Sequence, residues 1–247
     1  MFWKPRSSGA AAARPKIPQG FRVYAVGDVH GRADLLDKVL SRIETDLAKR
    51  PANHVFQVFL GNYVDEGPDS RGVLDRLVRH SRNDTVVCLR GNHEAYLSEF
   101  LKDPNVLEEW SQHGALTTLA SYGVTPSINT SAEERAELSM ALKKAMPPDH
   151  QRFLEELQTC FICGDYLFVH AGMRPGVSLA EQREEDLLGI GEDFLLHEGS
   201  FGRTVVHGHT PVDEPEIRTN RINIDTGAYA TGRLTCLVLE RDEVAFI

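Results

Sequence analysis

Short apolar runs and segments of helical spacing alternate along the first hundred residues. FRVYAV ends in GDVHG and precedes apolar residues spaced as in a helix from Leu35 to Leu47. VFQVFL ends in GNYVDEGPDS before a second such segment, whose expected N-cap is Ser70, and TVVCL ends in RGNHE before a helix expected from Glu94. Three strand–loop–helix units predict parallel strands whose following loops share one edge of a sheet.

The middle of the chain, from about 103 to 158, carries helix signals without strand signals, which predicts a helical insertion. Ser131 and Glu134 have the spacing of a capping box. The large apolar residues expected to pack inside the insertion are Trp110, Leu116, Leu119 and Tyr122. The acidic run EQREED at 181–186 is expected to be a solvated helix face.

The second half is predicted to be mostly β. CFIC and YLFV predict a hairpin that turns at Gly164 and Asp165, and TVVHGHTP, INIDTGA, RLTCLVLE and VAFI predict further strands. The expected fold is α/β, with mixed β-sheets that form a sandwich core, helices on its flanks and the insertion in the middle. Residues 1–19 lack periodicity and are expected to be a flexible tail, which leaves 20–247 as a single domain.

Composition narrows the classes of partner. The 247 residues carry 27 Lys and Arg against 36 Asp and Glu, a formal net charge of −9, with no cluster of basic residues. Neutralising a phosphate backbone needs such a cluster, so no nucleic-acid partner is expected. No apolar run approaches the roughly 20 residues of a membrane helix, and the N-terminal segment lacks the apolar centre of a signal peptide. The sequence therefore predicts a cytoplasmic protein with no membrane partner.

Polar residues of three types follow the predicted strands in Gly-flanked loops. They are Asp28, His30, Asn62, Asp65, Asn92, His93, His170, His207 and His209. One such loop alone more often indicates a turn glycine beside a satisfied polar residue, but five at one sheet edge favour a metal site. Oxygen and imidazole ligands without thiolate suit Mn, Fe or Zn. The candidates exceed what one tetrahedral ion uses, so we expect two divalent ions about 3.5–4 Å apart.

The motifs GDVHG, GNYVDEG, RGNHE, HAG and HGHT, in this order, resemble those of the calcineurin-like metallophosphoesterases, and within them the bacterial and phage serine/threonine phosphoprotein phosphatases. The resemblance implies six metal positions: Asp28 and His30 for the first ion, Asn62 as the bridge, and Asn92, His170 and His209 for the second. It also implies that His93 is the general acid and that Asp65 orients it. Manganese is the expected metal, with iron or zinc as alternatives, and His207 is expected to support the ligands or a turn.

The sequence departs from the family pattern where charge matters. Asn62 stands where the family has the bridging Asp, and Glu66 stands where it has Arg; Gly191 replaces a second phosphate-binding Arg and Gly189 a Trp. A neutral amide gives two dications less compensating charge, and the loss of Arg weakens the grip on phosphate. Either the site turns over poorly, or Glu66 reaches the metals and replaces the missing carboxylate.

The expected activity is hydrolysis of a phosphomonoester on phosphorylated Ser or Thr of a protein, by attack of metal-bound hydroxide without a phosphoenzyme. Arg174, close to His170 in the sequence, is a candidate substrate-binding cation, although a surface position explains it almost equally well. Two alternatives stay open. One is a phosphohydrolase acting on dinucleoside polyphosphates or nucleotides, and the other is a catalytically weak module that binds a phosphorylated partner.

Overall fold

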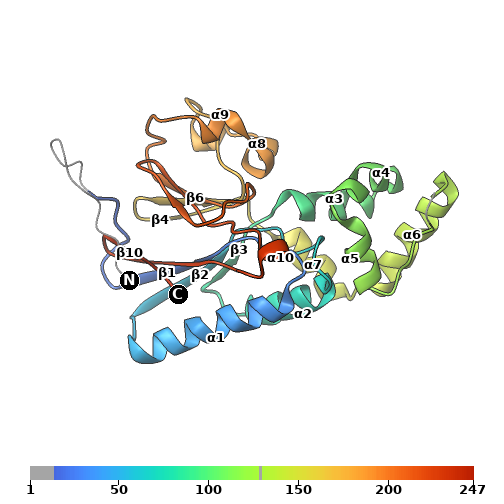
Figure 1. Cartoon of the computed structure of the whole chain (residues 1–247), viewed down its shortest axis with the longest axis horizontal. Coiled ribbons are helices and arrows are strands. Elements are labelled where there is room, and N and C mark those ends of the chain that lie inside the picture. Colours follow the sequence, from blue (N-terminus) through green and yellow to red (C-terminus); the bar gives the residue numbers. More distant parts are fainter. Residues whose placement is uncertain (1–13, 128–129) are drawn as a thin grey trace.

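The computed structural model describes residues 14–127 and 130–247, and its described strands form two five-stranded sheets (Figure 1). The first sheet has the order β10-β9-β1-β2-β3, and the second has the order β4-β5-β6-β8-β7. The first contains β1 (Phe21–Val26), β2 (His54–Phe59), β3 (Val86–Cys88), β9 (Cys236–Glu240) and β10 (Glu243–Phe246). The second contains β4 (Cys160–Cys163), β5 (Tyr166–Val169), β6 (Thr204–His207), β7 (Glu216–Ile217) and β8 (Arg221–Asn223).

Strand direction brings the expected loops to one edge of each sheet. β1, β2 and β3 run parallel, and β9 and β10 extend that sheet in antiparallel pairing. In the second sheet β5, β6 and β8 are parallel, while β4 and β7 pair antiparallel at its edges. The prediction of an α/β fold with two mixed sheets is therefore confirmed, and the carboxyl ends of six parallel strands carry the polar loops.

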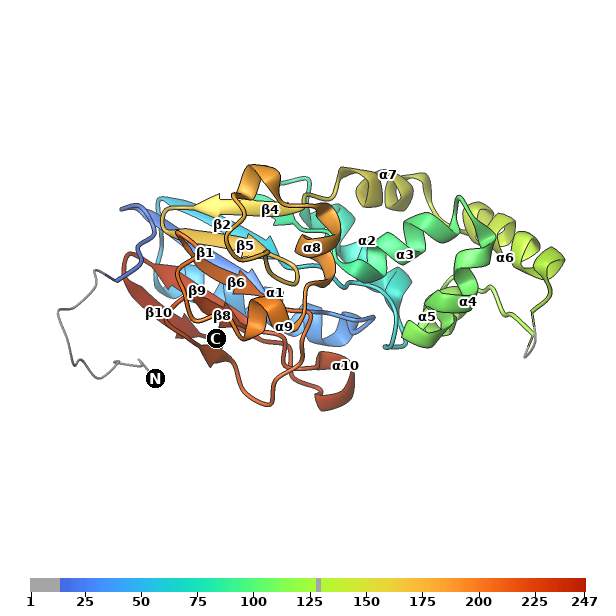
Figure 2. The same ribbon diagram turned by 90° about the horizontal axis from the view of Figure 1, so that it is seen from above.

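The alternation of side chains along β1 explains the layers. Val23 and Ala25 pack between the two sheets, whereas Tyr24 and Val26 join the cluster on the helix-covered face of the first sheet. That face is covered by α1 (Ala33–Lys49) and α2 (Ser70–His80), as Figures 1 and 2 show. The outer face of the second sheet packs on α8 (Glu184–Gly189) and α9 (Glu192–Leu195), which lie over it.

The helical insertion lies beyond one end of the sheets (Figure 2). It follows α3 (Asn92–Phe100) and contains the one-turn helices η1 (Pro104–Val106) and η2 (Ser111–His113) and four α-helices: α4 (Leu107–Trp110), α5 (Ala115–Ser121), α6 (Ala132–Ala145) and α7 (Pro148–Glu156). Trp110, Leu119 and Tyr122 are buried as expected. The prediction for Leu116 is wrong, because this side chain is 49% exposed at the surface of α5.

The structure corrects three boundaries. The core extends into the expected tail, because Ile17 is buried between the sheets; residues 1–13 lie outside the described part of the chain. The cap of α2 is Asp69, which accepts a hydrogen bond from the amide of Gly72, whereas Ser70 turns inward. α3 begins at Asn92, two residues before the predicted start. Among the described residues, no helix combines the length and apolar character needed to span a bilayer.

Candidate active site

The first pair of predicted metal ligands lies in the loop after β1, which packs closely against the loop after β2. Asp28 and His30 follow β1, and the Oδ2 atom of Asp28 lies 4.0 Å from Nε2 of His30. The Nδ1 atom of His30 faces the carbonyl of Val64 at 3.0 Å, which turns Nε2 toward Asp28. A Cβ on Gly67 would stand 2.0 Å from the carbonyl oxygen of His30, so only glycine lets the loop after β2 pass here.

Asn62 lies beside Asp28, where the family has its bridging carboxylate. Its amide Nδ2 donates to Oδ2 of Asp28 at 3.0 Å, and its Oδ1 accepts from the backbone amide of His93 at 3.3 Å. The residue has φ 52°, a left-handed conformation that Asn tolerates better than most residues. A side-chain amide in this place therefore neutralises no positive charge and engages one oxygen of Asp28.

The second set of predicted ligands converges on one amide oxygen. Oδ1 of Asn92, at the start of α3, lies 3.0 Å from Nε2 of His170 and 3.2 Å from Nδ1 of His209. The other ring nitrogen of His170 faces the carbonyl of Leu60 at 2.9 Å, which fixes the ring. Burial lowers the pKa of His209 to about 4 and lowers the pKa of His170 well below its usual value. Both rings are therefore held neutral, the form that binds a metal ion.

The donor set fits divalent ions except at the bridge. Asn92, His170 and His209 offer one oxygen and two nitrogens to a single ion, and Asp28 with His30 forms a second pair. Within the described ranges, no group of three or more His, Cys, Asp or Glu side chains is arranged to hold a metal ion. Amides occupy two of the six predicted positions, and Asp28 is the one carboxylate among them.

His93 and Asp65 form a buried pair next to these ligands. Nδ1 of His93 lies 2.8 Å from Oδ2 of Asp65, and the same oxygen accepts from the indole of Trp110 at 2.7 Å. Thr118 donates to the other carboxylate oxygen. Burial raises the pKa of Asp65 to about 7 and lowers the pKa of His93 to about 4. A phosphate anion next to His93 would favour its protonated form, because an opposite charge reverses the effect of burial.

Glu94 builds the loop that carries Asn62, a role that sequence reasoning missed. Its buried carboxylate accepts hydrogen bonds from the backbone amides of Asn62 at 2.8 Å, Tyr63 at 2.7 Å, Val64 at 3.3 Å and Gly91 at 2.9 Å. Burial raises its pKa to about 7, and the four amides act in the opposite direction. One side chain thus joins the loop after β2 to the start of α3. The signal was the final Glu of RGNHE, which lies among the polar loop residues.

We expect Glu94→Gln to destabilise the fold by about 3 kcal/mol, because the new amide nitrogen faces backbone N–H groups and leaves them without an acceptor. Urea denaturation followed by circular dichroism measures the effect. Glu99→Gln, an exposed change on the same helix, is the control and should stay within about 0.5 kcal/mol of the parent. Equal stabilities for the two variants would contradict this role of Glu94.

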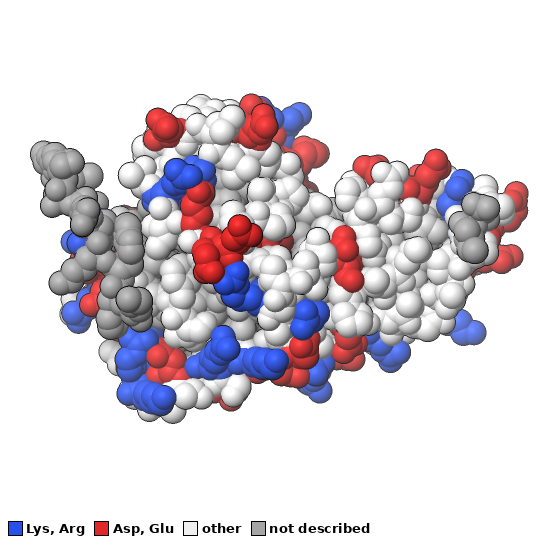
Figure 3. Space-filling view, in the orientation of Figure 1, with Lys and Arg blue, Asp and Glu red and all other residues white. Residues whose placement is uncertain are grey.

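The two predicted substrate-binding residues lie in different surroundings. Glu66 has φ 61° and a half-buried side chain. A Cβ added to Gly114 would lie 3.0 Å from the carboxyl carbon of Glu66. In the part of the chain that the structure describes, no hydrogen bond or ion pair joins Glu66 to the predicted metal ligands, so its role as a replacement ligand stays a prediction. Burial and the charge of His113 lower the pKa of His93, and the charge of Glu66 acts in the opposite direction. Lys and Arg side chains on the face in Figure 3 gather along α1, where Lys38, Arg42 and Lys49 are exposed.

Arg174 is engaged in ion pairs. Its guanidinium donates to Asp186 at 2.6 Å and 3.0 Å and to Asp193 at 3.2 Å. Asp186 is only 6% exposed, so the prediction that 181–186 is a wholly solvated face is wrong at this residue. A Cβ on Gly189 or Gly191 would meet nothing within 4 Å. The substrate-binding role of Arg174 stays a prediction, and two carboxylates already balance its charge.

Three more residues complete the surroundings of the site. Asp225 follows β8 and is 2% exposed. Burial is the main cause that raises the pKa of Asp28, and the charge of Asp225 is the next. His207 is buried, with Nδ1 facing the carbonyl of Gly208 and its ring edge-on to Phe194, and its supporting role stays a prediction. Tyr229, on α10 (Ala228–Thr231), packs its ring on His30. Sequence reasoning missed Asp225 and Tyr229, although Asp225 lies within the INIDTGA run that it predicted to be a strand and Tyr229 comes directly after that run.

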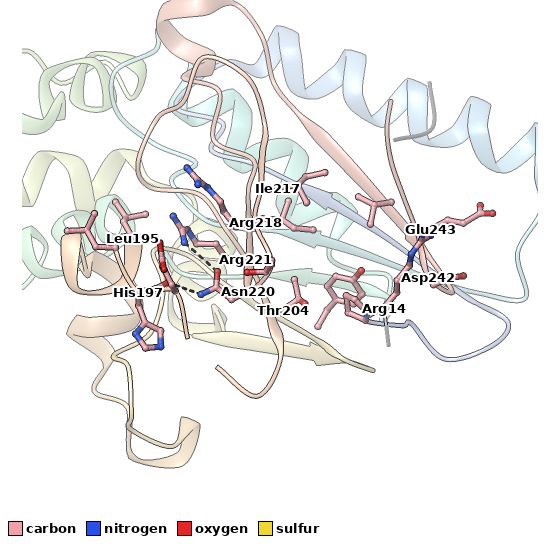
Figure 4. A pocket seen from close by; sticks show the side chains of 17 residues that line it. Arg14, Leu195, His197, Thr204, Ile217, Arg218, Asn220, Arg221, Asp242 and Glu243 are labelled. Atoms are coloured by element: carbon pink, nitrogen blue, oxygen red, sulfur yellow. Dashed lines mark hydrogen bonds between the residues drawn. The ribbon is translucent and has the colours of Figure 1, made fainter. Parts of the chain in front are cut away.

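A cavity of about 1030 Å³ lies elsewhere (Figure 4). Tyr166, Thr204 and Arg221 line it, and these are the first residues of β5, β6 and β8. The predicted ligands follow the opposite, carboxyl ends of the parallel strands. This cavity is therefore separate from the candidate active site.

A family model described as calcineurin-like phosphoesterase matches residues 21–244, and the chain belongs to this family of metallophosphoesterases. Members of the family use dinuclear metal centres. The chain is 28% identical over 241 residues to a protein of Halalkalibacterium halodurans named bis(5'-nucleosyl)-tetraphosphatase PrpE (asymmetrical), a match that covers 86% of this chain and 87% of that one. A protein of the same name from Anoxybacillus flavithermus is 28% identical over 231 residues and is covered to 88%.

Solved structures confirm the fold. One, described as a candidate diadenosine tetraphosphatase, superimposes with a TM-score of 0.61 at 21% identity and covers 92% of each chain. Another, a cold-active protein tyrosine phosphatase, gives a TM-score of 0.56 at 16% identity over 94% of this chain and 81% of that chain. The expected family is thus confirmed, whereas the finer assignment to serine/threonine phosphoprotein phosphatases is not.

Proposed function

We propose that this chain hydrolyses dinucleoside tetraphosphates and cleaves them asymmetrically, which was one of the alternatives that the sequence left open. The observation that carries the proposal is the similarity to curated bis(5'-nucleosyl)-tetraphosphatases over almost the whole length of both chains. Asymmetric cleavage adds water to one phosphorus and breaks one P–O–P bond. The products are then a nucleoside triphosphate and a nucleoside monophosphate.

The residues of the site support a hydrolysis of this kind. Divalent ions held by Asn92, His170 and His209 and by Asp28 and His30 would supply the charge that polarises a phosphoryl group and activates water. His93 lies 2.8 Å from Asp65 through its Nδ1 atom, and in this proposal it would give a proton to the departing phosphate oxygen.

The changed charges also suit this substrate class. Glu66 and Gly191 leave the loops without the two Arg that would grip a phosphate dianion, so a phosphomonoester loses much of its binding energy. A dinucleoside tetraphosphate carries two nucleosides, and contacts remote from the reacting phosphorus can replace that energy.

The test compares two substrates with the same protein preparation supplied with Mn²⁺. We expect kcat/KM for diadenosine tetraphosphate to exceed that for a phosphoserine peptide by at least about ten-fold. Ion-exchange chromatography should detect AMP and ATP in equal amounts. His93→Asn protein, purified in parallel, reports contaminating phosphatases. A faster reaction on the peptide, or ADP as the sole product, would contradict the proposal.

A further inference from the structure

An exposed aromatic ring lies at the edge of the candidate active site. Tyr229 is 41% exposed, and its ring centroid lies 5.4 Å from that of His30 with an interplanar angle of 75°. One edge contact with His30 accounts for only part of the ring surface. Tyr229 is therefore partly exposed to solvent beside residues predicted to bind metal and phosphate.

The short helix that presents Tyr229 is fixed on several sides. Arg32, directly after the first ligand loop, donates to the carbonyl of Ala228 at 3.0 Å. Asp225 accepts from the amide of Gly227 at 2.9 Å, and the hydroxyl of Thr231 donates to the carbonyl of Thr226 at 2.8 Å. The backbone that carries Tyr229 is therefore fixed, and the ring itself contacts His30, which lowers the entropy lost on binding.

Rings continue from Tyr229 across the site. His30 and His93 have centroids 4.7 Å apart, and His113 lies 6.2 Å beyond His93 and stacks on Tyr96 at 5.2 Å. Tyr229 and the pair of His113 and Tyr96 are thus the two ends of a series of ring contacts that passes through the two central histidines. A polyphosphate that occupies the centre would place an attached nucleoside near one of these ends.

We propose that Tyr229 is the stacking platform for one nucleobase of the substrate, an inference that rests on the proposed hydrolysis of dinucleoside tetraphosphates. Every base has a π-face, and stacking on an aromatic side chain contributes substantial binding energy without sequence preference. This contact replaces part of the phosphate-binding energy that is lost because Glu66 and Gly191 stand where the family has arginines. It also favours nucleotides over phosphorylated side chains, because phosphoserine offers no ring to stack.

The experiment measures both kinetics and binding for Tyr229→Ala, Tyr229→Phe and the unchanged chain. We expect Tyr229→Ala to raise KM for diadenosine tetraphosphate about ten-fold, the effect of losing one stacked base, with kcat within two-fold. Tyr229→Phe should retain the parent KM, because it keeps the ring. The inhibition constant of inorganic tripolyphosphate, which has no base, should not change. Phe246→Ala removes another exposed aromatic ring on β10 and serves as the matched control.

The outcomes separate this inference from the proposed function. An unchanged KM in Tyr229→Ala, while the parent hydrolyses diadenosine tetraphosphate, would overturn the inference alone. An equal weakening of tripolyphosphate would also overturn it, because Tyr229 would then act through His30. If the parent does not hydrolyse diadenosine tetraphosphate, isothermal titration calorimetry measures the Kd of this compound for the parent and for Tyr229→Ala. In that case a Kd raised about ten-fold by Tyr229→Ala supports the inference and rejects the proposed function, whereas absence of binding rejects both.

Discussion

His93→Asn is expected to lower kcat for diadenosine tetraphosphate by about 10²-fold, the lower end of the range for losing a general acid. The hydrogen bond of 2.8 Å between Nδ1 of His93 and Oδ2 of Asp65 orients the ring, and Asn cannot deliver a proton from the same position. A departing nucleotide phosphate is a weaker base than a departing alkoxide. The loss on a phosphoserine peptide should therefore be larger than the loss on the tetraphosphate.

Steady-state kinetics with both substrates measures this difference. His80→Asn is the matched control, because this half-buried histidine at the end of α2 faces Gln57 at 2.9 Å and makes no described hydrogen bond with a predicted site residue. It should leave kcat within about three-fold of the parent. A loss smaller than ten-fold in His93→Asn on both substrates would contradict the role of His93 as proton donor.

The placement of the polar loops follows from the sequence because parallel strands constrain it. Once FRVYAV, VFQVFL and TVVCL are taken as parallel strands, their following loops must meet at one edge, and Asp28, Asn62 and Asn92 do lie together. His170 and His209 follow strands of the second sheet, so the expectation that all five loops share the edge of one sheet is wrong. Strand direction collects the ligands within each sheet, and the packing of the two sheets on each other brings the two sets together.

Contacts between distant segments could not be predicted in this way. Glu94 has the helix position of an ordinary first-turn carboxylate, and only the fold shows that it accepts four backbone amides. Asp186 belongs to an acidic run, yet Arg174 holds it in a buried position. Ile17 stands in a segment without periodicity, and its burial depends on the two sheets that cover it. Each of these roles depends on a partner far away in the sequence.

Asn62→Asp is expected to convert a weak metal site into a stronger one. The change places a second buried carboxylate about 3 Å from Asp28, at the present distance of the amide nitrogen. Without metal the two carboxylates repel each other in a site that also contains Asp225, so the variant should unfold at a lower temperature in EDTA than the parent. With Mn²⁺ the order should reverse, because the ions bind the folded state and offset the repulsion.

The same variant should gain activity. A carboxylate at the bridge supplies the negative charge that two dications require, so we expect bound Mn²⁺ to rise toward two ions per chain and kcat to rise about 10²-fold. Plasma emission spectrometry counts the metal, and calorimetry follows the melting temperature with and without it. Asn220→Asp is the matched control, since this buried amide lies away from the site and donates to the carbonyls of His197 and Gly199. It should destabilise the chain in both conditions. If Asn62→Asp changes neither metal content nor the effect of Mn²⁺ on melting, the bridging position does not limit this site.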